Sequence, residues 1–153
     1  MRLALYQPDI PQNLGAAIRL AACFGAGLDV IEPCGFPLTD KAMKRAALDY
    51  GDLARIERHA GLRAFLAAPE RAEGRLILVE TDSETPLYRF AFAPGDTLIL
   101  GRESAGSPPE LYQAAQAGVH IPMAAGARSL NVVMAGAIAI AEALRQTGAW
   151  NAP

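Results

Sequence analysis

The chain has 153 residues, which is the length of one typical domain. Hydrophobic residues make up 52% of it and charged residues 20%, so it can bury a sizeable core, and this composition excludes an intrinsically disordered protein. No apolar run reaches the roughly 18 residues that a membrane span needs. The net charge of −2 argues against a protein that holds nucleic acid by overall attraction, but it leaves a local basic patch open.

The cysteines and the amino-terminal residues bear on the cellular compartment. Cys23 and Cys34 show no metal-ligand spacing, so we predict that both are free thiols in a reducing cytoplasm. Residues 1–8 form too short a hydrophobic stretch for a signal peptide and lack a small-residue cleavage site. We therefore expect a cytoplasmic protein.

Short apolar runs alternate with helical patterns in the first half of the chain, where proline and glycine mark the ends of the elements. The elements predicted here are a strand at 3–6, a helix at 13–24, a strand at 28–31, a short helix at 41–48, a strand near 54–57 and a helix at 62–68.

The second half continues the alternation, and a loop that carries Pro86 separates its first two strands. The elements predicted here are strands at 76–79 and 97–100, a helix that Pro109 and Glu110 begin, a strand at 119–121 and a helix at 129–146. Continuous apolar strands separated by helices are typical of a parallel sheet. We predict an α/β fold with helices on both faces of the sheet and a single domain over residues 1–153, since no linker or repeat divides the chain.

Several familiar catalytic motifs are incomplete or wrongly placed in this sequence. Gly25-Ala26-Gly27 lies between a helix and a strand, whereas a dinucleotide fingerprint follows a strand. The segment 101–106 has the glycine spacing of a phosphate loop, but Ser107 and Pro108 stand where Lys and Ser or Thr are required. Ser104 lacks the glycine of a nucleophile elbow, and two histidines with two cysteines show no zinc spacing. These failures disfavour dehydrogenases, nucleoside triphosphatases, serine hydrolases and zinc enzymes.

A polar stretch at 11–19 follows the first predicted strand. Asn13 has the side chain of a helix cap, which is a purely structural role. Arg19 lies among apolar neighbours, so we expect it to be partly buried and to need an anionic or polar partner. A surface salt bridge is the alternative explanation for Arg19.

Two further glycine-marked stretches follow strands, at 98–108 and at 121–131. Gly101 at the end of a central strand would let a ligand approach the backbone, and ligands of α/β sheets bind at such ends. The alternative is a glycine-rich turn before the next helix. Ser129 is either the cap of the last helix or part of a small-residue loop that leaves room for a ligand.

Together these stretches resemble the SPOUT class of RNA methyltransferases, and within it the short family that methylates the 2′-oxygen of tRNA wobble nucleotide 34. The resemblance covers nearly the whole chain, and its ordered set is more specific than any single motif. The segments that carry it are Leu5-Tyr6-Gln7-Pro8, Ile10-Pro11-Gln12-Asn13, Ile31-Glu32-Pro33, Ala47-Leu48-Asp49-Tyr50, Gly101-Arg102-Glu103-Ser104-Ala105-Gly106, Ile121-Pro122-Met123 and Arg128-Ser129-Leu130-Asn131.

The resemblance implies a trefoil knot near the carboxyl terminus, against the usual rule that chains do not thread loops. It implies S-adenosylmethionine as methyl donor, without a metal, held at positions that match Val79, Gly101, Ile121, Ser129 and Leu130. Arg19 matches the catalytic arginine of the family. Since a guanidinium stays protonated, we expect it to position the reacting hydroxyl and a phosphate rather than to act as a base. Glu103 would serve either as the base or as an anchor for its loop.

The resemblance also implies partners, namely tRNA and a second copy of this chain. Gly136, Ala137 and Ala141 on an almost wholly apolar last helix favour a homodimer, although a helix buried in its own domain is the alternative. The candidate RNA-binding residues are Lys41, Lys44, Arg45 and Arg128. A solvated helix face is the alternative for the first three of them.

The sequence departs from the family pattern in its last helix. Asn131-Val132-Val133-Met134-Ala135 replaces the usual Asn-x-Ser-Asn-Ala, and Ala141 stands at a position that is often aromatic. These changes bear on RNA docking and leave the cofactor motif intact. Two alternative functions stay open: ribose methylation at another RNA position, and a non-catalytic module that binds RNA or a nucleotide on the same fold.

Overall fold

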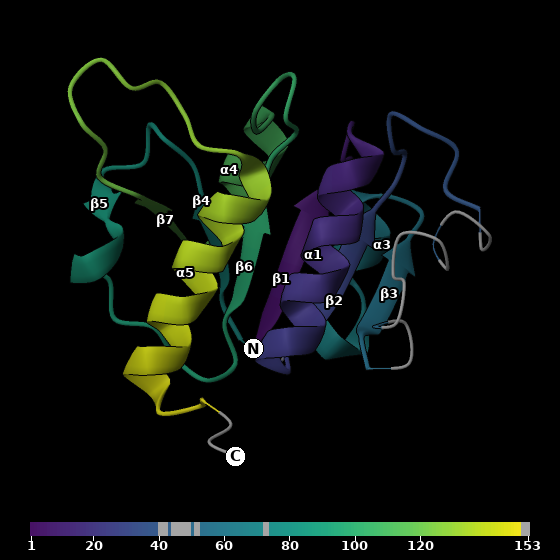
Figure 1. The fold of residues 1–153 in the computed structure, drawn as a ribbon, viewed down its shortest axis with the longest axis horizontal. Helices are drawn as coiled ribbons and strands as arrows, with labels where there is room; N and C mark the ends of the chain where they lie inside the picture. Colours follow the sequence, from purple (N-terminus) through teal and green to yellow (C-terminus); the bar gives the residue numbers. More distant parts are fainter. Residues whose placement is uncertain (40–42, 44–49, 51–52, 72–73, 151–153) are drawn as a thin grey trace.

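A parallel sheet forms the centre of the molecule (Figure 1). The computed structural model describes residues 1–39, 43, 50, 53–71 and 74–150. Within them, seven strands pair in the order β3-β2-β1-β6-β4-β7-β5, and every pairing is parallel. The strands are β1 (Arg2–Tyr6), β2 (Gly27–Ile31), β3 (Arg55–His59), β4 (Leu76–Val79), β5 (Thr85–Pro86), β6 (Thr97–Leu100) and β7 (Ala117–His120). The helices are α1 (Pro11–Phe24), α3 (Leu62–Leu66), η2 (Pro69–Arg71), η3 (Leu87–Arg89), α4 (Pro109–Ala114) and α5 (Val132–Thr147).

Helices cover both faces of the sheet. Successive residues of a strand point to opposite faces, so the apolar run of β1 supplies two cores at once. Leu3 packs in the core under α1 and α5, whereas Ala4 packs in the core with Phe65 of α3 and Leu111 of α4. Figure 1 shows α1 and α5 in front of the sheet and α3 and α4 behind it. The predicted α/β class with helices on both faces is confirmed.

The predicted elements are confirmed in type but differ at their ends. Strand β7 is Ala117–His120 rather than 119–121, which places Ile121 in the following loop. Strand β3 ends at His59 rather than at residue 57. The segment predicted as a loop around Pro86 contains β5, a two-residue strand that pairs with β7 and is too short for an alternating pattern. The predicted helix at 41–48 lies outside the described residues except at Met43.

Asn13 does not cap α1, and of the two roles left open for Ser129 the structure has the loop rather than the cap. Helix α1 starts at Pro11 after Ile10, so Asn13 lies inside its first turn and caps nothing. Helix α5 starts at Val132, and Asn131 caps it by accepting hydrogen bonds from the N–H groups of Val133 and Met134. Ser129 therefore lies in the loop before the helix.

One buried carboxylate joins the first three strands. Asp29 of β2 is 2% exposed and accepts hydrogen bonds from Arg2 Nε at 2.7 Å, Arg2 Nη2 at 2.8 Å and His59 Nε2 at 2.8 Å. A buried carboxylate needs such partners because desolvation of an unpaired charge is costly. An apolar pattern alone does not predict them.

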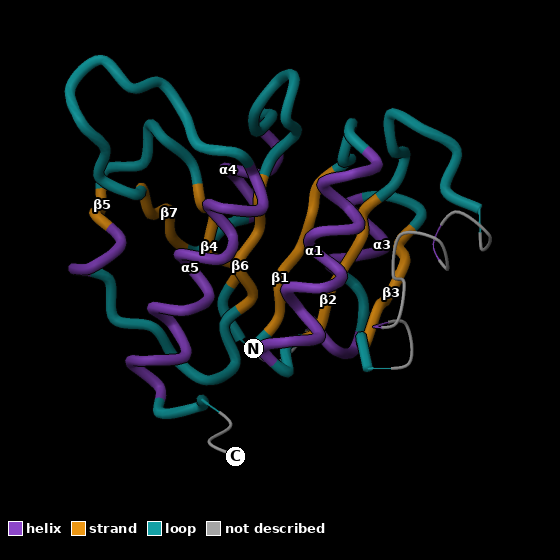
Figure 2. The backbone as a smooth tube through the Cα atoms, viewed as in Figure 1, coloured by secondary structure: helices purple, strands orange, loops and turns teal. Residues whose placement is uncertain are grey.

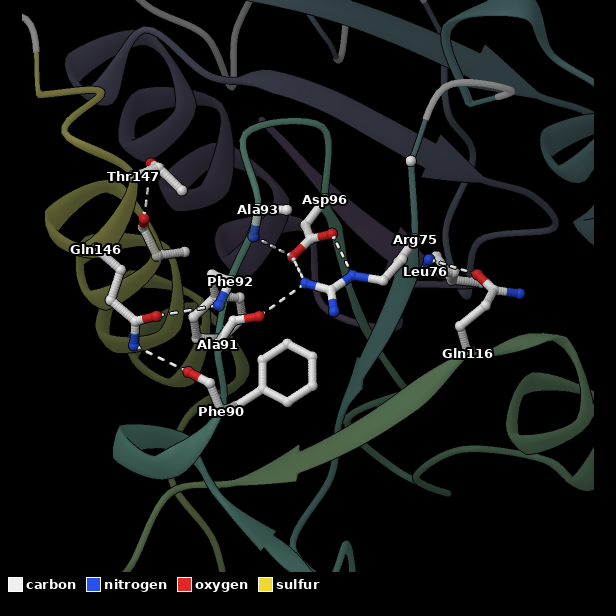
Figure 3. Close-up of polar contacts among 12 residues, drawn as sticks. Arg75, Leu76, Phe90, Ala91, Phe92, Ala93, Asp96, Gln116, Gln146 and Thr147 are labelled. Carbon is white, nitrogen blue, oxygen red and sulfur yellow. Dashed lines mark hydrogen bonds and ion pairs between the residues drawn. The ribbon is translucent and has the colours of Figure 1, made fainter.

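The carboxyl-terminal end of α5 is fixed to the segment before β6 (Figure 3). The Gln146 side chain accepts a hydrogen bond from Phe92 N at 3.0 Å and donates one to Phe90 O at 3.0 Å. In the same segment, buried Asp96 accepts two hydrogen bonds from Arg75 and one from Ala93 N. These contacts hold the carboxyl-terminal end of α5 near the amino ends of the strands. The first residues of α5 lie at the carboxyl ends of the strands.

Gly136 of α5 is buried and faces the core of its own chain, which at this position agrees with the alternative of a helix buried in its own domain. A Cβ at Gly136 would lie 3.0 Å from Leu100 Cδ1 and 3.4 Å from Leu3 Cδ1. The glycine therefore lets α5 pack closely against β1 and β6.

We expect Gly136→Val to destabilise the protein by about 1–3 kcal/mol, because the added branches must displace close-packed leucines. The matched control is Ala137→Val, one position along the same helix, where the side chain is only half-buried. The free energy of unfolding in urea measures both. Equal losses for the two variants would contradict this packing role.

Candidate active site

A pocket of about 500 Å³ opens at the carboxyl ends of β4, β6 and β7. Figure 2 shows that the loops after these strands lie at the same edge of the sheet. All five residues that the resemblance assigned to the cofactor line this pocket, together with Glu103. The described lining residues are Ile10, Asn13, Val79, Glu80, Thr81, Leu100, Gly101, Arg102, Glu103, Gly106, Ile121, Met123, Ser129, Leu130, Asn131, Val132 and Ala135.

The buried side chain of Asn13 joins the three polar stretches. Its Nδ2 donates a hydrogen bond to Glu103 Oε1 at 3.0 Å, and its Oδ1 accepts one from Asn131 Nδ2 at 3.0 Å. The donor and the acceptor of one amide thus hold residues from the second and the third stretch. Sequence reasoning assigned Asn13 only a capping role, because no local pattern shows a contact between residues so far apart.

Glu103 is tied to the amino-terminal segment through both carboxylate oxygens. Oε2 accepts a hydrogen bond from Asp9 N at 2.7 Å, and Oε1 accepts the one from Asn13. Of the two predicted roles for Glu103, the geometry favours the loop anchor. Asp9, which sequence reasoning missed, lies in the polar segment that precedes Asn13.

Asp9 also holds the segment after β6 through ionic contacts. Its carboxylate accepts hydrogen bonds from Arg102 Nη2 at 2.9 Å, from Ser104 N at 3.1 Å and from Ser104 Oγ. The Arg102 guanidinium and then the Ser104 hydroxyl stabilise the charged form and lower the pKa of Asp9 to about 2. Arg102 is thereby paired and contributes no free positive charge to the pocket.

Gly101 is required by its own loop. A Cβ at this position would lie 2.7 Å from Gly106 C and would also meet Ser107 Oγ. The loop turns back here, since Arg102 and Gly106 exchange backbone hydrogen bonds at 3.0 and 2.9 Å and Gly106 has a φ of +65°. We expected this glycine to let a ligand approach the backbone. The structure adds a second reason, since the returning backbone of the same loop needs the space that a side chain would fill.

The two predicted arginines that the structure describes lie outside the lining of the pocket. Arg19 is exposed on α1, so the expectation that it is partly buried is wrong; its guanidinium lies 5.4 Å from the centre of the Tyr50 ring. Neither Arg19 nor Arg128 belongs to the described lining, although Arg128 is exposed immediately before Ser129. Lys41, Lys44 and Arg45 lie outside the described residues.

The described residues hold no group of three or more His, Cys, Asp or Glu side chains that is placed to bind a metal ion. In the same part of the chain, no helix is long and apolar enough to cross a membrane. Cys23 and Cys34 are free thiols, and burial raises the pKa of Cys34 to about 11.

The fold is that of a known class of enzymes. Residues 1–141 match the SpoU rRNA Methylase family, and the chain belongs to that family. A tRNA (cytidine(34)-2′-O)-methyltransferase of Ancylobacter novellus is 49% identical over 98% of this chain and 95% of its own length. One of the same name from Beijerinckia indica is 48% identical over 96% of this chain and 92% of its own length.

Solved structures agree with this assignment. A structure from work on the 2-OH methylation of C/U34 on tRNA has a TM-score of 0.86 and 40% identity, over 95% of this chain and 94% of that one. The SpoU methyltransferase AviRb of Streptomyces viridochromogenes, in complex with the cofactor AdoMet, has a TM-score of 0.82 and 26% identity. That match covers 95% of this chain and 60% of AviRb.

We expect Asn13→Ala to lower the free energy of unfolding by about 1–3 kcal/mol, because it leaves two polar partners without their hydrogen bonds. The matched control is Gln12→Ala, which removes an exposed amide from the adjacent position and should change stability by less than about 0.5 kcal/mol. Chemical denaturation measures both. A loss for Asn13→Ala no larger than that of the control would contradict the linking role.

The pKa of Asp9 predicts a pH dependence of stability. Its folded pKa of about 2 lies below the ordinary value of 3.8, so its contribution is present above pH 3.8 and is lost as the pH falls through 2. Asp9→Asn should therefore unfold more easily than the wild type at pH 6, and the difference should stay unchanged down to about pH 4 and shrink below it as the pH falls toward 2. Denaturation of both proteins across this range is the measurement. A difference that stays constant with pH would show that the Asp9 charge is not involved.

Proposed function

We propose that this protein methylates the 2′-oxygen of nucleotide 34 of tRNA, a cytidine or a uridine, with S-adenosylmethionine as the methyl donor. The observation that carries the proposal is the convergence of the five expected cofactor residues on one pocket. Near-full-length similarity to relatives named tRNA (cytidine(34)-2′-O)-methyltransferase supports the substrate. In the overall reaction the methyl–sulfur bond breaks and leaves S-adenosylhomocysteine, a carbon–oxygen bond forms at the ribose, and the proton of the 2′-hydroxyl is released to solvent.

The pocket suits an adenosine derivative in size and chemistry. Its volume of about 500 Å³ lies within the usual range for small-molecule sites. Leu100, Ile121 and Leu130 supply an apolar lining for a purine, while Ser129 and the backbone at Gly101 and Val79 supply polar groups. S-adenosylmethionine would supply the methyl group there, and the residues of this chain hold and orient it.

The threaded connection that the resemblance implies is part of the same proposal. We propose that the chain forms a trefoil knot around the loops after β6 and β7. The resemblance to the SPOUT class supports it, and the strand order sets the loops after β4, β6 and β7 side by side, where the threading would take place. The hydrogen bond between Asn13 and Asn131 holds the last loop over this edge of the sheet.

Arg19 is proposed to position the substrate. Its guanidinium remains protonated at neutral pH, so it orients the 2′-hydroxyl and a neighbouring phosphate and does not remove the proton. Because Arg19 lies outside the described lining of its own pocket, we propose that it acts on RNA bound across a dimer. Exposed Arg128, beside the pocket, would contact the RNA backbone together with the predicted patch at Lys41, Lys44 and Arg45.

The surface of α5 supports a homodimer. Met134 is 59% exposed and Ile138 is 41% exposed, and residues four apart lie on the same side of a helix. Leu130, just before the helix, is also exposed and lines the pocket. A dimer that covers this surface would bring two pockets near the interface. We propose a cytoplasmic location, in keeping with two free thiols.

The decisive experiment for the activity is transfer of labelled methyl groups to total tRNA, followed by mapping of the modified nucleotide. We expect a single labelled ribose, at position 34, and a much larger loss of transfer than of tRNA affinity for Arg19→Ala, since positioning acts in the transition state. The control is Arg63→Ala, a change of the same type on α3 at the opposite face. Label at another position would overturn the substrate, and no label at all would favour the non-catalytic alternative.

The dimer has its own test. The double variant Met134→Lys with Ile138→Lys should give a monomer mass by light scattering at micromolar concentration, because it places charges in an apolar interface. The control, Leu66→Lys on α3, introduces one lysine at an exposed apolar position on the other face and should leave the dimer intact. A monomeric wild-type protein would contradict the proposed assembly.

A further inference from the structure

Glu80 is a charged residue of the pocket without a part in the proposed methyl transfer. It follows Val79 at the carboxyl end of β4, is half-buried and lines the pocket. Its Oε2 accepts a hydrogen bond from Ser107 Oγ at 2.8 Å, and its Oε1 accepts one from Thr81 N at 3.0 Å. The carboxylate is therefore held in one place by neutral donors from the loops on two sides of the pocket.

The charges around the pocket do not balance. Three described lining residues carry a charge, namely Glu80, Arg102 and Glu103, and the positive one is paired with Asp9 outside the lining. Glu103 is tied by two neutral donors and Glu80 by others, and within the described residues neither carboxylate has an ion-pair partner. The pocket thus presents a net negative charge to whatever fills it.

A ligand that covers Glu80 removes the water that solvates its carboxylate. That loss is costly unless the ligand brings a positive charge, because a desolvated charge needs a partner. S-adenosylmethionine carries a sulfonium and has a net charge of +1, whereas S-adenosylhomocysteine, the product after methyl transfer, is neutral overall. The same carboxylate therefore favours the substrate and disfavours the product.

We infer that Glu80 is a specificity residue of the cofactor pocket that selects the cationic methyl donor over its neutral product. The inference rests on the proposed function. Glu80 stabilises the sulfonium form by charge, and once the methyl group has left, the carboxylate faces a neutral thioether and the product dissociates more readily. The role concerns binding and release and adds no step to the chemistry.

The test is calorimetric titration of Glu80→Gln with S-adenosylmethionine, S-adenosylhomocysteine and sinefungin, an analogue with a protonated amine in place of the sulfonium. The substitution keeps the shape of the side chain and removes its charge. We expect about ten-fold weaker binding of the two cationic ligands, with the affinity for S-adenosylhomocysteine changed by less than about two-fold. Thermal unfolding of the unliganded variant checks that the fold is retained.

Two controls separate charge from loop structure. Glu84→Gln removes the same charge from an exposed position of the same loop, outside the lining, and should change none of the three affinities. Ser107→Ala removes the hydrogen bond to Glu80 but keeps the carboxylate, so the preference for the cationic ligands should persist. This second variant also tests the inference if Glu80→Gln does not fold, because loss of the preference there would overturn it.

The outcomes distinguish this inference from the proposed function. Equal weakening of all three ligands by Glu80→Gln would overturn the inference in favour of a contact with the ribose or the amino group, which substrate and product share. Unchanged affinities would overturn it outright. A wild-type protein that binds none of the three would overturn the proposed function, and the inference with it.

Discussion

The side-chain amide of Asn13 is the contact on which the geometry of the site depends. One amide offers a donor and an acceptor, and here the donor holds Glu103 while the acceptor receives Asn131. Asn131 in turn caps α5, so the position of the last helix is coupled to that of the first. Because the pocket lies between these elements, its shape follows from a short chain of hydrogen bonds rather than from core packing alone.

The side chains of the loop after β6 both fix the loop in place and set part of the charge of the pocket. Arg102 and Ser104 bind Asp9, and Glu103 binds the backbone of Asp9, so consecutive side chains of this loop fasten it to the segment after β1. These contacts neutralise the only positive charge of the described lining and leave the carboxylates of Glu80 and Glu103 without an opposite charge in the pocket. The loop is thus a wall of the pocket and supplies one of its two carboxylates, Glu103, whereas Glu80 follows β4.

The sequence predicted the fold class and the main elements well, because apolar runs and helical spacing are local signals. The ends of the strands were predicted less accurately, since β7 ends at His120 and not at residue 121. The two residues of β5 are too few to form any pattern. The pocket residues came from the ordered resemblance to a family, and the structure brings them together. The cofactor role of these residues remains a proposal.

What local patterns could not predict depends on contacts between distant segments. Asn13 has a side chain typical of a helix cap, but it binds Glu103 and Asn131, which lie far away in the sequence. The partners of Asp29 lie on two other strands, and the space that Gly136 leaves is defined by leucines of β1 and β6. Its neighbours in the sequence suggested that Arg19 is partly buried, but helix geometry turns it outward.

The distances along the chain between Asn13, Glu103 and Asn131 have a consequence during synthesis. A growing chain that has not yet reached Asn131 contains every residue of the sheet but lacks the last wall of the pocket and the cap of α5. Affinity for the ligand therefore arises late, after the residues of all seven described strands have been made. Ligand binding then favours the finished arrangement over partly folded ones, since anything that binds only the native form stabilises it by mass action.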